Sequence, residues 1–207
     1  VADAAGTGTL TLTNGVFCDD HNNGNGGIFA GFLDLNGATQ TFSVRDGTQT
    51  SDLLVSSAMQ NGGLIFDAVE PGAGLELSGT NTYTGGTQVS GGTLIISGSL
   101  GGSAMDISGG TVEGTGALTF NISGSTFDQI VMTGGDLDIL ALTLNVNPSG
   151  ASASEYVIVD ATGGGTISGP FLNDPPSGWE IEYTPTASSP TTITLIPPPS
   201  STLMTIR

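Results

Sequence analysis

The residue types best suited to chemistry gather in one stretch rich in glycine and asparagine, residues 18–27. It reads Cys-Asp-Asp-His-Asn-Asn-Gly-Asn-Gly-Gly and holds the single cysteine and the single histidine of the chain. Because calcium prefers carboxylate and amide oxygens, the loop is a candidate calcium site with the ligands Asp19, Asp20, Asn22, Asn23 and Asn25. The spacing is not that of an EF-hand, since His21 holds the third position and Ala30 the twelfth. A polar turn without metal is the alternative interpretation.

The sequence lacks the residues that a nucleophilic catalytic triad or a zinc site would need. A Ser-His-Asp triad would have to use His21, and no Gly-x-Ser-x-Gly turn presents a nucleophile. A zinc site requires three or four nitrogen, sulfur or carboxylate ligands, and one histidine with one cysteine is too few. Cys18 cannot form an intramolecular disulfide, so an inert thiol and an intermolecular bridge both stay open.

Two carboxylate pairs could in principle hydrolyse glycosides. Asp136 with Asp138 and Glu180 with Glu182 are two residues apart, which places each pair on one outward strand face. We interpret both as solvated charge. Arg45 is the only basic residue before the C-terminus, so a polysaccharide lyase would lack cations to hold an acidic sugar. The sequence therefore predicts no enzyme, and no cofactor apart from the candidate calcium.

The composition narrows the class of protein further. The 207 residues include 34 glycines, 37% hydrophobic residues and a net charge of −17, with two Lys and Arg in total. Nucleic-acid binding requires cationic groups that displace counterions, so nucleic acid is excluded as a partner. Membrane insertion is not expected, because no apolar run approaches the ~20 residues of a spanning helix.

Apolar and polar residues alternate in short segments, which predicts strands with one buried face. The side chains expected inside are Leu10, Leu12, Leu118, Phe120, Ile122, Leu137, Ile139, Leu142, Leu144, Val146, Trp179, Ile181, Tyr183, Ile193 and Leu195. Turns with positive φ are expected at Asn14-Gly15, Asn36-Gly37 and Asn61-Gly62.

A decayed repeat suggests how these strands are arranged. Gly-Gly-Thr begins at Gly85, Gly91, Gly109 and Gly164, and the second and third copies lie 18 residues apart, near the length of one short coil. Short strands become stable by stacking coil on coil. We expect an all-β solenoid as one elongated domain over 1–196. It would comprise an N-terminal part at 1–73, for which a sandwich-like form is left open, a repeat zone at 74–150 and a closing unit at 151–196.

The segment from Leu77 to Leu94, Leu-Ser-Gly-Thr-Asn-Thr-Tyr-Thr-Gly-Gly-Thr-Gln-Val-Ser-Gly-Gly-Thr-Leu, closely resembles the autotransporter-associated β-strand repeat. Flanking pieces at 33–42, 156–160 and 179–183 look similar. The resemblance implies a secreted, right-handed parallel β-helix at a bacterial surface. In autotransporters the repeat belongs to the exported passenger, ahead of a membrane barrel. Since 207 residues leave no room for a barrel, we expect a stand-alone secreted form.

The last residues, 197–207, form a proline-rich spacer and a terminal segment. After Pro197-Pro198-Pro199, we expect a strand donated to another copy of the chain, formed by Thr202, Leu203, Met204, Thr205 and Ile206; a frayed terminus is the alternative. The predicted function is structural: a self-assembling extracellular subunit of a filament, sheath or matrix. Its partners would be copies of itself, with extracellular polysaccharide as a further candidate. An adhesin or glycan-binding module with an outward ladder of Thr and Asn is the second hypothesis, and a carbohydrate-active β-helix enzyme the third.

Overall fold

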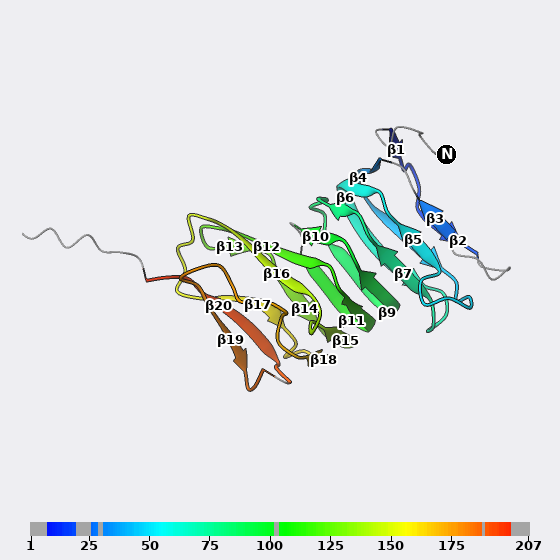
Figure 1. The fold of residues 1–207 in the computed structure, drawn as a ribbon. Coiled ribbons are helices and arrows are strands. Elements are labelled where there is room, and N and C mark those ends of the chain that lie inside the picture. The colour runs from blue at the N-terminus through cyan, green and yellow to red at the C-terminus, as the bar shows by residue number, and fades with distance from the viewer. Residues whose placement is uncertain (1–7, 20–25, 29–30, 102–103, 188, 200–207) are drawn as a thin grey trace, which may run out of the picture.

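The computed structural model describes residues 8–19, 26–28, 31–101, 104–187 and 189–199 (Figure 1). These residues form strands joined by turns and contain no helix, so the all-β prediction is confirmed. Within them there is accordingly no helix long and apolar enough to cross a membrane. The strands pair into two sheets, and successive strands run across an elongated body (Figure 1).

Parallel strands lie in three stacks, and the chain passes through the stacks in the same order again and again. The first stack contains β1 (Thr9–Thr11), the start of β4 (Phe32–Val44), the start of β6 (Ala58–Ala68), β8 (Thr80–Asn81), β10 (Ser99–Gly101), β12 (Ala117–Ser123) and β16 (Thr143–Ser149). A bond from the Thr82 amide to the Met59 carbonyl, at 2.8 Å, joins β8 to β6.

The second and third stacks follow the same rule. The second contains β2 (Val16–Cys18), the later parts of β4 and β6, the start of β9 (Thr87–Ile96), the start of β11 (Met105–Gly114), β14 (Ile130–Met132) and β17 (Tyr156–Asp160). The third contains β3 (Gly26–Ile28), β5 (Leu53–Val55), β7 (Gly74–Leu77), the later parts of β9 and β11, β15 (Asp136–Asp138) and β18 (Thr166–Ser168). The described strands of residues 8–73 thus join the parallel stacks and do not form a separate sandwich.

The register shows how many residues one pass requires. Leu94 of β9 pairs with Val112 of β11, 18 residues further on, which is the spacing of the second and third Gly-Gly-Thr copies. Passes elsewhere are longer, and Leu137 pairs with Ile167. Because pairing is in register, apolar side chains of successive passes lie above one another in the core.

The core fills the space between the stacks. Of the side chains expected inside, ten are buried: Leu118, Phe120, Ile122, Leu137, Ile139, Leu142, Leu144, Val146, Ile193 and Leu195. Leu12, Trp179, Ile181 and Tyr183 are partly buried against this core. The prediction for Leu10 is wrong, since 38% of it is exposed. Its strand β1 ends the order of described strands, so only β4 packs beside it.

Glycines mark the corner between the second and third stacks. Gly92, Gly110 and Gly135 have φ values of 66°, 72° and 71° and lie above one another, each approaching the carbonyl oxygen of the pass before. A Cβ atom at Gly110 would collide with the Gly92 carbonyl oxygen. The corner therefore requires glycine for both conformation and space.

Two of the three predicted turns are confirmed. Asn36 and Gly37 have φ values of 59° and 68°, and Asn61 has 58°. The prediction for Asn14-Gly15 is wrong, because neither residue has positive φ. Gly15 is required there for another reason: a side chain would collide with the backbone of Thr41 in the next pass.

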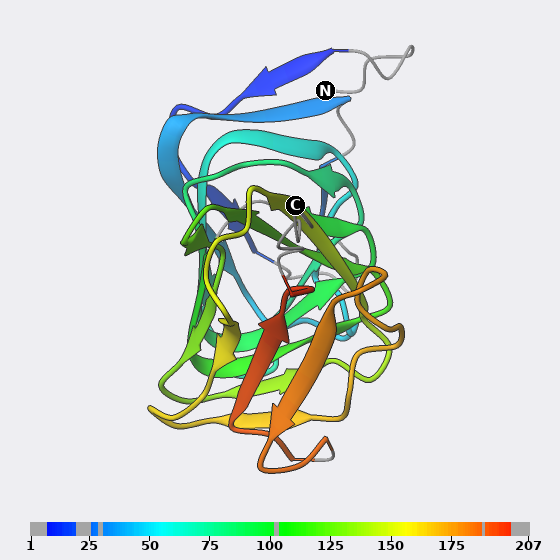
Figure 2. The same cartoon turned by 90° about the vertical axis from the view of Figure 1, so that its left-hand side faces the viewer.

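The C-terminal end of the stack is closed by antiparallel strands. β17 pairs with β20 (Thr192–Ile196), and β20 pairs with β19 (Glu180–Thr184). Figure 2 views the molecule from this end, with β19 in orange and β20 in red across the near side. A further antiparallel strand, β13 (Thr126–Phe127), pairs with β12 at the edge of the smaller sheet. This change of direction ends the parallel stacking of the described strands.

Candidate functional site

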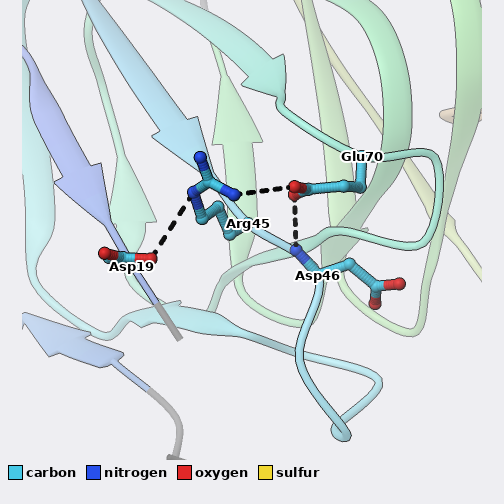
Figure 3. Close-up of polar contacts among 4 residues, drawn as sticks. All are labelled: Asp19, Arg45, Asp46 and Glu70. Carbon is cyan, nitrogen blue, oxygen red and sulfur yellow. Dashed lines mark hydrogen bonds and ion pairs between the residues drawn. The ribbon is translucent and has the colours of Figure 1, made fainter. Parts of the chain in front are cut away.

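The positive charge of Arg45 lies between two acidic side chains, Asp19 and Glu70, near the ends of successive passes (Figure 3). Its Nη1 atom is 3.0 Å from Glu70 Oε1, and its Nε atom is 3.4 Å from Asp19 Oδ1. The Asp46 amide donates to Glu70 Oε2 at 3.2 Å. Asp19, Arg45 and Glu70 follow strands of the second stack closely, so the parallel register brings them together. All three side chains are about 40% exposed, which leaves the pairs screened by water.

The candidate calcium loop can be judged only in part. Asp20, Asn22, Asn23 and Asn25 lie outside the described residues, as does His21. Asp19 is described, and its carboxylate lies beside Arg45. Within the described part of the chain, no three His, Cys, Asp or Glu side chains form a group able to hold a metal ion. Calcium binding stays a prediction.

A buried carboxylate that the sequence did not point to lies beside Cys18. Asp52 is fully buried, and its oxygens accept hydrogen bonds from the amides of Gly47 at 2.9 Å and Gly74 at 2.8 Å. The Cys18 thiol donates to the Asp52 carbonyl oxygen at 3.6 Å. These contacts tie the turn before β5 to the next pass, so we assign Asp52 a structural role. No pattern in the sequence separates it from the exposed aspartates.

Three polar residues of the Leu77–Leu94 segment, Asn81, Tyr83 and Thr87, face inward. Asn81 Oδ1 accepts from the Met59 amide at 3.1 Å, and its Nδ2 donates to the carbonyls of Gly79 and Ser99, both at 3.1 Å. Tyr83 is fully buried with its hydroxyl 2.7 Å from Thr87 Oγ1, and burial raises the pKa of this phenol above its usual value. Asn81, Tyr83 and Thr87 are therefore structural, since their polar side-chain groups are hydrogen-bonded inside the stack.

The two carboxylate pairs lie where the sequence predicts them. Asp136 is exposed and Asp138 partly buried on β15, while Glu180 and Glu182 are both exposed on β19. The Leu140 amide donates to Asp138 Oδ1 at 3.0 Å. Their outward positions are those of solvated charge.

An outward surface of threonine and asparagine follows β12 and β16. Thr119 pairs with Asn145 and Asn121 with Asn147 in the register of these strands. Asn147 Nδ2 donates to Asn121 Oδ1 at 3.1 Å. Asn145 and Asn147 also line a hollow of about 380 Å³. An adhesin or glycan-binding module, the second hypothesis, would use an outward ladder of this kind, and that role stays a prediction.

A second hollow lies at the closed end, with a volume of about 740 Å³. We call it the Trp179 groove. Its lining consists of Ala151, Ser152, Ala153, Ser154, Gly178, Trp179, Glu180, Ile196, Pro197, Pro198 and Pro199. Alternation with Ile181 and Tyr183 predicted Trp179 inside the closing unit. An aromatic residue close to Ser, Pro and Glu in the sequence was the available signal for a binding surface.

Comparison with known proteins identifies the segment that contains Asn81 and Tyr83. Residues 73–96 match the model of the passenger-associated-transport-repeat. The chain carries an autotransporter passenger-type repeat. The resemblance stated for Leu77–Leu94 is confirmed, and the passenger repeat coincides with β7, β8 and β9. It thus contributes a strand to each of the three stacks.

A relative is similar over a longer stretch. The adhesin BmaC autotransporter of Brucella suis biovar 1 (strain 1330) is 35% identical over 106 residues, which cover 49% of this chain and 3% of the relative. The chain therefore spans only a small fraction of that adhesin. No solved structure matches.

Proposed function

We propose that this chain is part of an adhesin-like, non-enzymatic passenger exposed on or secreted from a bacterial surface, and that it folds as a right-handed parallel β-helix. The observation that carries the proposal is the continuous parallel pairing through the passenger repeat, where β7, β8 and β9 join the passes on either side. The similarity to an autotransporter adhesin supports the surface role.

The architecture suits display of a surface at a distance. Each pass contacts mainly the passes beside it, so the stack extends without needing a larger globular core. Its outward side chains on β12 and β16 are uncharged Thr and Asn. With a net charge of −17, attraction to anionic surfaces is weak, and adhesion would depend on hydrogen bonding and apolar contact.

A binding assay with the intact chain tests the adhesive role. Fluorescently labelled protein is incubated with epithelial cells and with plates coated in extracellular matrix, and bound protein is measured against concentration. We expect saturable binding that survives physiological salt. The control is the same chain unfolded by heat, which keeps the charge but loses the surface. Equal binding of folded and unfolded protein would refute the proposal.

Self-assembly remains a second proposal. It is favoured by β1 and β19, which end the described strand order and leave backbone groups open to another chain. The predicted donated strand, Thr202–Ile206, lies outside the described residues. Deletion of 200–207 should leave folded monomers where the full chain forms filaments in electron micrographs. Normal filaments after deletion would end the donated-strand hypothesis.

A further inference from the structure

We propose that the Trp179 groove binds a neutral saccharide, with the indole ring as its stacking platform. The inference deepens the proposed adhesive function by naming a ligand class and the surface that takes it. The groove volume of about 740 Å³ falls in the range of small-molecule sites, about 300–1,000 Å³. It accommodates an oligosaccharide of a few rings.

One buried tyrosine holds both sides of this groove. The Tyr156 hydroxyl accepts hydrogen bonds from the amides of Ser152 at 2.8 Å and Ala153 at 3.0 Å, and donates to the Gly124 carbonyl at 2.6 Å. These bonds fix the wall formed by residues 151–154. The tyrosine ring also lies 6.1 Å from the Trp179 ring, centre to centre. The two walls are therefore positioned before any ligand arrives, which lowers the entropy cost of binding.

The Trp179 ring belongs to an aromatic cluster and also lines the groove. Phe127 packs edge-on against Tyr156 at 5.3 Å with an interplanar angle of 75°, so the three rings form a cluster. Trp179 packs only partly against the core and lines the groove. Its indole N–H forms no hydrogen bond with the described residues. An aromatic ring with an apolar face and a free donor matches a sugar ring, which has C–H groups on its faces and hydroxyls at its edge.

The remaining polar groups favour a neutral sugar. Ser152 and Ser154 are exposed at one wall and Glu180 at the other. Their hydroxyls and carboxylate can exchange hydrogen bonds with sugar hydroxyls. The lining contains no Lys, Arg or His, so a uronate or sialylated sugar would meet the Glu180 charge without a compensating cation.

Trp179 makes the test direct because it is the only tryptophan in the chain. Its fluorescence therefore reports this groove alone. We would titrate the full chain with hexasaccharides of glucose, mannose and N-acetylglucosamine and with hexagalacturonate as the acidic comparison. At least one neutral hexasaccharide should shift the emission to shorter wavelength, saturably, and protect it from acrylamide quenching. Hexagalacturonate should not.

Matched variants locate the site by calorimetry. Trp179→Ala should weaken binding at least about tenfold, and Trp179→Phe by less, because it keeps an aromatic ring over Tyr156. Glu180→Gln should change affinity, whereas Glu182→Gln, two residues along the same strand and outside the lining, should not. Circular dichroism confirms that each variant is folded.

Three results would overturn the inference. One is the absence of a response to every neutral hexasaccharide at millimolar concentration. Another is Trp179 fluorescence that acrylamide does not quench even without a ligand, which would mean that the protein fills its own groove. The last is unchanged affinity in folded Trp179→Ala. Saccharide binding together with failed cell adhesion would uphold this site and reject the adhesive function, so the two failures are distinguishable.

Discussion

Replacement of Asn81 by alanine should destabilise the stack by about 3 kcal/mol. Asn81 is almost completely buried and forms three hydrogen bonds, to the Met59 amide and to the carbonyls of Gly79 and Ser99. A hydrogen bond contributes about 1 kcal/mol net, and a buried amide left without a partner costs about 1–3 kcal/mol. Since Met59 loses its acceptor, the loss should lie at or above the sum of the three bonds.

Urea unfolding followed by circular dichroism measures this loss. The urea concentration at the midpoint should fall, while the dependence of the unfolding free energy on urea stays unchanged. Asn81→Asp is an informative companion, because it keeps an acceptor for the Met59 amide but places an oxygen, in place of the amide nitrogen, against the carbonyls of Gly79 and Ser99. At neutral pH its loss of unfolding free energy should be at least as large as that of Asn81→Ala. Asn145→Ala, at an exposed position on β16, is the control and should stay within about 0.5 kcal/mol of the wild type. A loss below about 1 kcal/mol for Asn81→Ala would refute the reasoning.

Three further predictions concern a corner, a buried phenol and an ion pair. Gly110→Ala should cost at least about 2 kcal/mol, since φ is positive and Cβ meets the Gly92 carbonyl, whereas Gly124→Ala, with positive φ but open space, should cost about 1 kcal/mol in thermal unfolding. Burial raises the pKa of Tyr83, so the unfolded chain alone loses this proton above pH ~10; stability should fall as pH rises past that point, and less steeply in Tyr83→Phe. Arg45→Gln should cost under about 0.5 kcal/mol, a loss that about 1 M salt removes, because its pairs are exposed.

Each of these has a contrary result. Equal losses of stability in Gly110→Ala and Gly124→Ala would show that the close approach of Gly110 to the Gly92 carbonyl is unimportant. An identical alkaline slope with and without the Tyr83 hydroxyl would mean that this phenol does not control the high-pH loss. A salt-independent loss above about 1 kcal/mol in Arg45→Gln would show that the cluster stabilises the fold more than its exposure suggests.

The strand pattern was predictable because a strand places alternate side chains on opposite faces. That rule located Leu118, Phe120 and Ile122 correctly inside. It failed at Leu10, whose strand has a described neighbour on one side only. Turn prediction was right at Asn36-Gly37 and wrong at Asn14-Gly15, because the glycine at position 15 is needed for close approach to the next pass rather than for positive φ.

The binding surface was less predictable. Trp179 was expected inside the closing unit on its alternation with Ile181 and Tyr183, and it is indeed partly buried. That it also lines a groove depends on residues 151–154 and 196–199, which β17 and β20 bring to it from other parts of the chain. Local alternation contains no information about such neighbours.

By itself, the sequence determined the alternating strands, the passenger repeat and the acidic, lysine-free composition, because each depends on residue type and local spacing. Only the tertiary structure decided that Asn81 and Asp52 lie inside while Asn145 and Asp136 face water. The physical reason is that burial of a polar residue requires partners. Besides local ones, Asn81 and Asp52 each need a partner from a neighbouring pass, about 20 residues away. Which asparagine finds an amide and a carbonyl in the next pass is settled by register, not by its neighbours in sequence.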